Sequence, residues 1–210
     1  MRHGRVDSAN VRPYILAALA GLCAFAQGDR LIDIPLGRKI PSGVIRLEGQ
    51  FDQSDASQSD AYLDWGVDSN WEASLHYENP VDARGRLTGD LSYNLIPPIT
   101  GISPGISVGV QDLANNTGDG RRFYAASTFK VDGTDLWTPV ELTLGASYDH
   151  QIRPFVGLSF PLDPRLRLMA EHDGFRISAG AEYKPTRNMA LRWVVRGSVS
   201  ELSLRLTTKL

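Results

Sequence analysis

The chain has 210 residues, of which 42% are hydrophobic and 22% are charged, and its formal net charge at pH 7 is -2. This near-balance of charge argues against nucleic acid as a partner, because a nucleic-acid-binding surface needs a basic excess. The length allows one substantial domain or two small ones.

Residues 1–26 have the pattern of a secretory signal peptide. Three arginines precede the apolar run YILAALAGLCAFA (residues 14–26), and the small residues Ala24 and Ala26 occupy the two positions that signal peptidase reads. A signal-anchor helix is the alternative, but the run is short for crossing a bilayer. We expect cleavage after Ala26. The single cysteine, Cys23, would leave with the signal, so no disulfide is expected.

A lead-in rich in proline and glycine, LIDIPLGRKIPSG, follows the signal, and we assign residues 27–43 to a periplasmic segment. From residue 44 to residue 210, apolar and polar residues alternate in stretches such as VIRLEGQFD, WEASLHY and VELTLGASYDH. Successive side chains of a strand point to opposite faces, so each stretch predicts a strand with one apolar face. About twelve strands of roughly 8 to 11 residues can be counted, separated by turn-forming clusters such as PLDP and KPTRN.

The alternation alone does not decide whether the apolar face meets a protein core or lipid, because soluble sandwiches alternate too. Export, an even strand count and strand lengths suited to a tilted crossing favour lipid. The fold class predicted for residues 44–210 is therefore all-β: an antiparallel transmembrane β-barrel of about 12 strands in the bacterial outer membrane. Its expected partners are outer-membrane lipid and the barrel assembly machinery.

Aromatic residues gather toward strand ends, where membrane barrels carry interfacial girdles. The predicted lipid-interface aromatics are Trp71, Tyr77, Tyr93, Tyr148, Phe160, Phe175, Tyr183 and Trp193.

A second set of residues is charged and shares the polar parity of the strands. The predicted lumen-facing residues are Arg46, Glu48, Glu72, Asp90, Glu141, Arg153, Arg167, Glu171, Arg176, Glu182, Arg192, Arg196 and Arg205. The basic members are all arginine, whose rigid fork suits pairing in a confined space. The early strands supply mainly carboxylates and the later strands an arginine excess.

Two interpretations of these lumen charges stay open. They could form a salt-bridge network that fills the barrel, or an arginine-lined wall that favours an anionic solute or a polysaccharide. Barrels of eight strands are filled by side chains and those of sixteen hold open channels, so about twelve strands leaves the choice undecided.

Catalytic and metal-binding patterns are sparse. His76, His150 and His172 lie far apart in the sequence without a metal-ligand spacing, so we expect no metal and no cofactor. A membrane lipid hydrolase would have to use His76 with Ser74 or Ser92. The stretches NNTGDGRR and DGTDLW lack the context of phosphate or calcium loops and are interpreted as polar loops.

Three stretches carry a family resemblance: LIDIPLGRKIPSGVIRLEG, PGISVGVQDLANN and RLRLMAEHDGFRISAGAEYKPTRNMALRW. They resemble the YjbH-type (GfcD-type) outer-membrane barrel family, in which strand pairs of the form L-x-L-x-A-E-x-D-G and x-x-x-G-x-x-Y repeat. Members are associated with capsule or exopolysaccharide export and are usually longer, whereas this chain would supply one barrel.

The function expected from the sequence is a non-catalytic pore or export component of the outer membrane, linked through the resemblance to exopolysaccharide or capsule. A plugged structural or interaction barrel without transport is the alternative, and an outer-membrane lipid hydrolase is a distant third.

Overall fold

The computed structural model describes residues 30–54, 59–79, 85–117, 120–132 and 139–210. The predicted signal peptide, the first residues of the lead-in and most of the DGTDLW loop lie outside these ranges. The described part of the chain holds no helix long and apolar enough to cross a membrane, a finding that does not concern strands.

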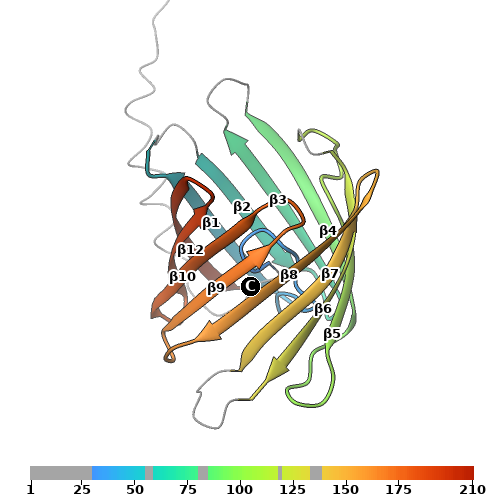
Figure 1. Ribbon diagram of the computed structural model, residues 1–210, viewed down its shortest axis with the longest axis vertical. Coiled ribbons are helices and arrows are strands. Elements are labelled where there is room, and N and C mark those ends of the chain that lie inside the picture. Colours follow the sequence, from blue (N-terminus) through green and yellow to red (C-terminus); the bar gives the residue numbers. More distant parts are fainter. Residues whose placement is uncertain (1–29, 55–58, 80–84, 118–119, 133–138) are drawn as a thin grey trace, which may run out of the picture.

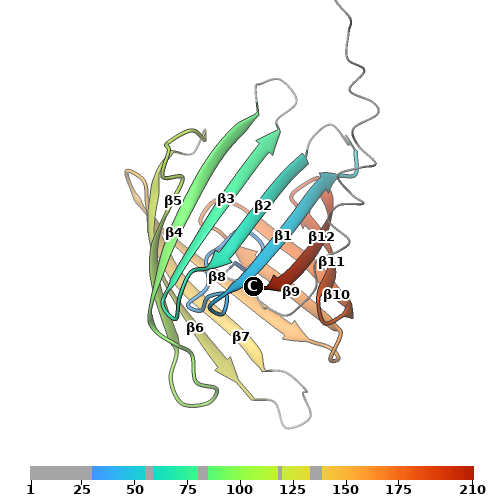
Figure 2. The ribbon, with the colours of Figure 1, turned by 180° about the vertical axis from the view of Figure 1, so that it is seen from behind.

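Twelve antiparallel strands form one closed barrel, as Figures 1 and 2 show. They are β1 (Val44–Asp52), β2 (Ser59–Gly66), β3 (Trp71–Asn79), β4 (Arg86–Ile96), β5 (Gly105–Gln111), β6 (Arg122–Val131), β7 (Val140–Tyr148), β8 (Ile152–Pro161), β9 (Leu166–His172), β10 (Ile177–Thr186), β11 (Met189–Arg196) and β12 (Val199–Lys209). Each strand pairs with its neighbours in sequence, and the predicted fold class is confirmed.

The barrel closes where β1 pairs with β12. The register runs from Val44 opposite Lys209 to Asp52 opposite Glu201, and the amide of Leu210 donates to the carbonyl of Gly43 at 2.7 Å. Closure removes the free strand edges that an open sheet would present. We call the rim where β1 begins and β12 ends the near rim, and the opposite one the far rim.

The barrel has inverted polarity, with apolar side chains outside and charged ones inside. On β3 and β11 the outward Leu75 and Trp193 are 48% and 50% exposed, whereas the inward Arg46 and Glu182 of β1 and β10 are fully buried. A soluble sandwich would bury the apolar face instead. This distribution is that of a transmembrane β-barrel, whose outward band meets lipid.

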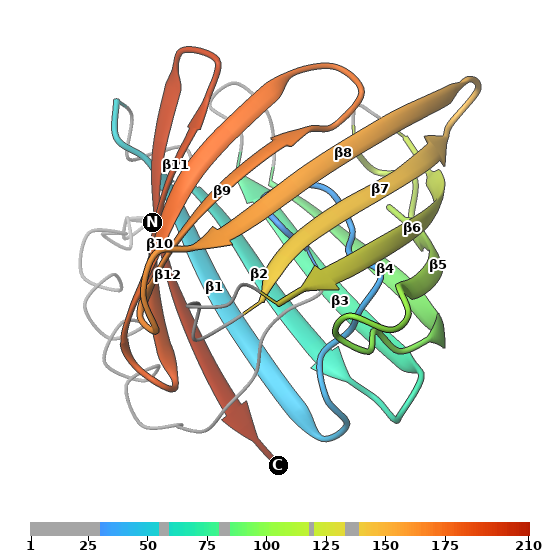
Figure 3. The same ribbon diagram turned by 60° about the horizontal axis from the view of Figure 1, so that its bottom comes forward.

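The buried apolar core lies inside the barrel and centres on the segment that precedes β1. Leu31, Ile32, Ile34 and Leu36 are at most 2% exposed. They pack against inward side chains of the wall, namely Ala126, Phe155, Met169 and Val194. We call residues Arg30–Ile40 the plug; Figure 3 shows this blue segment within the ring of strands.

Residues 27–43 are predicted to form a periplasmic lead-in, and the structure places residues 30–40 of this segment inside the barrel. Five of the plug residues are large aliphatics, and their burial in the lumen removes this apolar surface from water. Leu31, Ile32, Ile34, Leu36 and Ile40 are all buried.

Glycines of the wall let the plug approach closely. A Cβ placed on Gly105 would lie 2.1 Å from the carbonyl oxygen of Gly37, and one on Gly157 would lie 2.5 Å from Cδ1 of Ile34. At Gly105 the obstacle is backbone, so a side chain does not fit there, whereas at Gly157 it is the end of a flexible side chain that can move aside.

Gly105→Ala is therefore expected to destabilise the barrel by about 1–3 kcal/mol, since the new methyl group meets backbone rather than a flexible side chain. The measurement is the temperature at which the folded, SDS-resistant band is lost on gel electrophoresis. Gly49→Ala is the matched control: a Cβ there meets only the Phe51 ring at 3.6 Å, and the change should stay within about 0.5 kcal/mol. Equal shifts for both variants would contradict the close fit.

Candidate functional site

The tip of the plug is held by one carboxylate of β9. Glu171 accepts hydrogen bonds from the backbone amides of Ile32, Asp33 and Ile34, at 2.9, 2.8 and 3.4 Å. Buried backbone amides that belong to no sheet or helix need another hydrogen-bond acceptor. Glu171 thus replaces the partner strand that the plug lacks.

Further wall side chains bind the plug backbone toward the near rim. Glu72 accepts from the amide of Ile40 at 2.6 Å. Thr128 accepts from the amide of Gly37 at 2.7 Å, and Asn94 donates to the carbonyl of Gly37 at 3.1 Å. Side chains of the barrel wall therefore supply hydrogen-bond partners to the plug backbone along its length.

Charged residues of the plug also pair with the wall. Asp33 makes a two-pronged ion pair with Arg196, with N–O distances of 2.8 and 2.7 Å. Arg38 pairs with Glu141 at 2.9 Å. The bidentate contact between Arg196 and Asp33 is geometrically specific, so it fixes the position of the plug as well as neutralising its charge.

Arg30 lies at the start of the plug and joins it to a ring stack. Its guanidinium contacts Glu48 at 3.0 Å and lies 3.3 Å above the ring of Tyr62. The Tyr62 ring stacks in turn on His76, with 4.0 Å between ring centroids.

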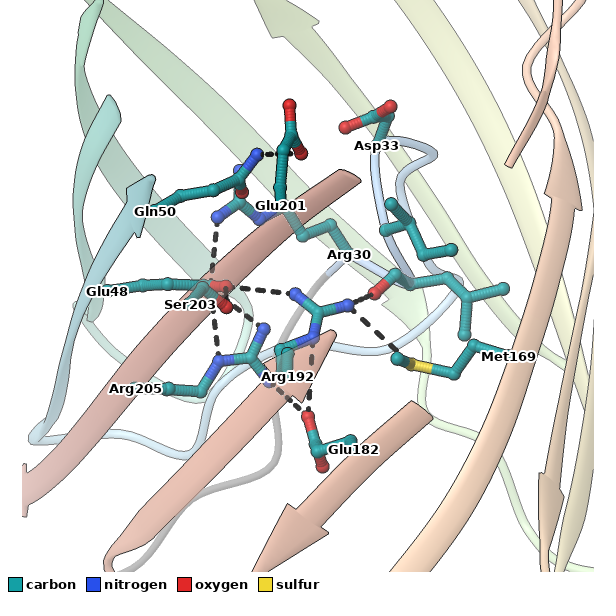
Figure 4. A network of polar contacts seen from close by, with 12 residues as sticks. Arg30, Asp33, Glu48, Gln50, Met169, Glu182, Arg192, Glu201, Ser203 and Arg205 are labelled. Atoms are coloured by element: carbon teal, nitrogen blue, oxygen red, sulfur yellow. Dashed lines mark hydrogen bonds and ion pairs between the residues drawn. The ribbon is translucent and has the colours of Figure 1, made fainter. Parts of the chain in front are cut away.

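A network of arginines and glutamates fills the lumen beside the plug (Figure 4). Glu48 accepts from Arg192 at 3.1 Å, from Ser203 at 2.8 Å and from Arg205 at 2.9 Å. Arg192 also donates to the carbonyl of Leu31 in the plug. Buried charges are stable only when they are paired and hydrogen-bonded, so the network and the plug support each other.

The plug lies between a hollow at the far rim and a hollow at the near rim, each with a smaller hollow beside it. The far vestibule has a volume of about 500 Å³ and is lined by seven carboxylates and four arginines, together with Tyr62, His76, Phe155 and Phe175. The near vestibule has a volume of about 530 Å³ and is lined by five basic residues and one carboxylate, Glu182. The two mouths of the barrel therefore differ in the sign of their charge.

Most of the residues predicted to face the lumen are buried within it. The buried ones are Arg46, Glu48, Glu72, Glu141, Glu171, Glu182, Arg192, Arg196 and Arg205. Asp90 lines the far vestibule and Arg167 the near one. Arg153 lies on β8 with its guanidinium 3.8 Å above the ring of Phe175.

Arg176 differs from the others because it belongs to no strand. It lies in the turn between β9 and β10 at the far rim, its side chain is 57% exposed, and it contacts Asp33 at 3.6 Å and Asp173 at 3.5 Å. The four residues between β9 and β10 form a tight turn, so none of them continues the strand alternation that points side chains into the lumen. Arg176 is therefore a residue of the mouth rather than of the enclosed lumen.

The predicted aromatics fall mostly on the outer face near the two rims. Trp71, Phe160 and Tyr183 are exposed near the near-rim ends of their strands, and Tyr77 and Tyr148 near the far-rim ends. Tyr93 packs edge-on against Trp71, with 4.8 Å between centroids, and Trp193 is exposed on β11.

Phe175 is the exception among the aromatics. It lies in the β9–β10 turn, lines the far vestibule and stacks beneath Arg153, so it faces the mouth of the lumen rather than lipid. The pairing with a guanidinium explains this position, since an aromatic face attracts a cation.

Sequence reasoning missed the plug residues that the wall binds, above all Arg30, Asp33 and Arg38, and the wall residue Asp64, which pairs with Arg46 at 2.7 Å. The sequence signal that could have identified the plug is the frequent recurrence of large aliphatic residues in a segment predicted to be exposed to water.

The candidate hydrolase residues show no catalytic arrangement. His76 Nε2 is buried and makes no hydrogen bond, and His76 Nδ1 lies 3.6 Å from Glu78. Among the described residues, no group of three or more His, Cys, Asp or Glu side chains could hold a metal ion.

No family model matches the chain, and no curated protein matches it significantly. Among solved structures, the chain is similar to one described as the NanC porin in a rhombohedral crystal form. The two share 12% sequence identity, the match covers 79% of this chain and 100% of that chain, and the TM-score is 0.47. The class of the protein rests on its own geometry, which is that of a transmembrane β-barrel with a plug in its lumen.

Asp112 organises the loop that follows β5 at the far rim. Its backbone has a φ of 52°, a left-handed conformation that Asp tolerates. Burial opposes ionisation of the carboxyl, but hydrogen bonds from Thr117, Thr88 and the amide of Asn116 outweigh it and lower the pKa of Asp112 to about 2.

Because the pKa of Asp112 in the folded barrel is lowered, its carboxylate stabilises the loop above about pH 4, and this contribution is lost as the pH falls toward 2. We expect the amide chemical shifts of Asn116 and Thr117, measured by NMR in detergent micelles, to titrate with a midpoint near 2. Thr117→Val removes one donor and should move the midpoint upward. A midpoint near 4 in the unaltered protein would contradict the hydrogen-bonded loop.

Proposed function

We propose that this protein is a non-catalytic pore of the bacterial outer membrane whose passage is closed by its N-terminal plug. The observation that carries the proposal is the position of the plug between two vestibules that open at opposite rims. The apolar outer band of the barrel supports a membrane location, and the predicted signal peptide supports export to the outer membrane.

The plug has the attachment expected of a movable element. It adds no strand to the sheet, and its contacts are hydrogen bonds, ion pairs and apolar packing, all of which water or a solute can replace. Exposing its four core aliphatics would cost about 1.5–3 kcal/mol each, so the closed state dominates at rest. Passage therefore requires the plug to leave its anchors.

The resemblance to the YjbH-type family extends this proposal to capsule or exopolysaccharide export. That extension rests on the three sequence stretches that resemble the family.

A second candidate function is a permanently plugged scaffold. The density of buried ion pairs around Glu48 and Glu182 favours it, because breaking one partner of a buried pair strongly destabilises a fold. In this case the loops and the vestibules would be the functional parts, and no solute would pass.

The two candidates predict different single-channel currents in planar bilayers. We expect the mature chain to be mostly silent with rare openings, and Glu171→Gln to open more often, because an amide nitrogen replaces one acceptor of the plug amides. A disulfide between cysteines introduced at Ile34 and Gly157, which face each other, should hold the pore shut until it is reduced.

Asp64→Asn is the matched control for these currents. It also removes one lumen carboxylate, but Asp64 pairs with Arg46 within the wall and not with the plug. Its open probability should equal that of the unaltered protein. A barrel that stays silent with Glu171→Gln and also with the plug deleted would favour the scaffold, and a disulfide-locked barrel that conducts freely would show that the plug does not close the passage.

A further inference from the structure

The near vestibule concentrates positive charge at the bottom of a cavity. Five basic residues line it, Arg165, Arg167, Lys184, Arg187 and Arg205, against the single carboxylate of Glu182. Its volume of about 530 Å³ lies within the range of small-molecule sites, which is roughly 300–1,000 Å³.

Glu182 is already shared among several cations. It lies 3.0 Å from Arg167, 3.1 Å from Arg205, 3.5 Å from Lys184 and 3.6 Å from Arg192. One carboxylate carries a single negative charge, so it cannot neutralise four neighbours.

Glu48, the next carboxylate of the network, does not relieve this excess. It contacts Arg30, Arg192 and Arg205, two of which also contact Glu182. Arg167, Lys184, Arg192 and Arg205 thus converge on Glu182 and Glu48, while Glu141 and Asp163 line a smaller hollow beside Arg167 and Lys184. The lining of the near vestibule keeps an excess of basic over acidic side chains, and a bound anion is the direct way to balance such an excess.

We propose that the near vestibule binds a soluble organic anion that carries two or more carboxylate or phosphate groups. Arg167 and Arg205 lie at the base of the cavity, where their guanidinium forks already hold Glu182 and Glu48, so they supply positive potential to a ligand bound above them. Lys184 is half-buried on β10, and Arg187 lies at the β10–β11 turn on the rim, where each can meet an incoming ligand.

The far vestibule makes the preference directional. Its seven carboxylates outnumber its four arginines, so the same anion is repelled there. This inference rests on the proposed pore in naming its class of solute, whereas binding itself can be measured without any movement of the plug.

The test is isothermal titration of the mature chain in a neutral detergent, with citrate and inorganic phosphate as probes. We expect citrate to bind, and to bind more tightly than phosphate because it reaches more than one cation. The double variant Lys184→Gln/Arg187→Gln should weaken citrate binding about tenfold or more, since charge-assisted contacts are lost. Glu182→Gln should strengthen it, because a competing internal carboxylate is removed; a purely structural salt bridge predicts no such gain.

The matched control removes two arginines from the far vestibule, Arg122→Gln/Arg176→Gln, and should leave citrate binding within about twofold of the unaltered protein. The SDS-resistant band shows that each variant is folded. If Glu182→Gln does not fold, the rim variant still decides, because Arg187 lies in a turn.

Three results would overturn the proposal: no citrate binding by the folded barrel, an equal loss in both double variants, or binding of phosphatidylglycerol micelles that alone depends on Lys184 and Arg187. The last result would assign the site to a lipid headgroup. Citrate binding without single-channel currents would retain the anion site while rejecting the pore.

Discussion

The closure of the sheet is the constraint on which the rest of this structure depends. Once β1 pairs with β12, every second side chain must lie in a confined lumen, and in this chain many of those side chains are charged. Charges taken out of bulk water must find partners. The arginine–glutamate network around Glu48 and Glu182 follows from this requirement, and its contacts from Arg192 and Arg205 to Glu48 join β11 and β12 to β1.

The backbone of the plug is also buried in the lumen, so its polar groups need partners as well. A segment that enters a closed barrel has no strand edge to pair with, so its amides and carbonyls need side-chain partners. Glu171 has no arginine partner among its hydrogen bonds and binds three plug amides instead. The apolar side chains of the plug then complete a small dry core inside an otherwise polar lumen.

Together these features give the molecule an axis with two unlike ends. The near vestibule is basic and the far one is acidic and aromatic, with the plug between them. Unequal ends would favour the approach of one class of ion from one side. A barrel that only needed to be filled could pair its charges evenly along the axis, and the uneven distribution is the reason to expect a solute.

The strands and their inner face follow from the amino-acid sequence alone, because a period of two reflects the geometry of the strand and shows which residues share a face. This period places Glu48, Arg192 and Glu182 on the lumen face, and it places apolar residues such as Leu75 on the outer face. Which charges meet depends on how the barrel closes, since Glu48 and Arg205 are 157 residues apart in the chain. The inward turn of the residues before β1 also depends on the tertiary structure, because the aliphatic pattern of a short segment predicts burial but does not say against which surface.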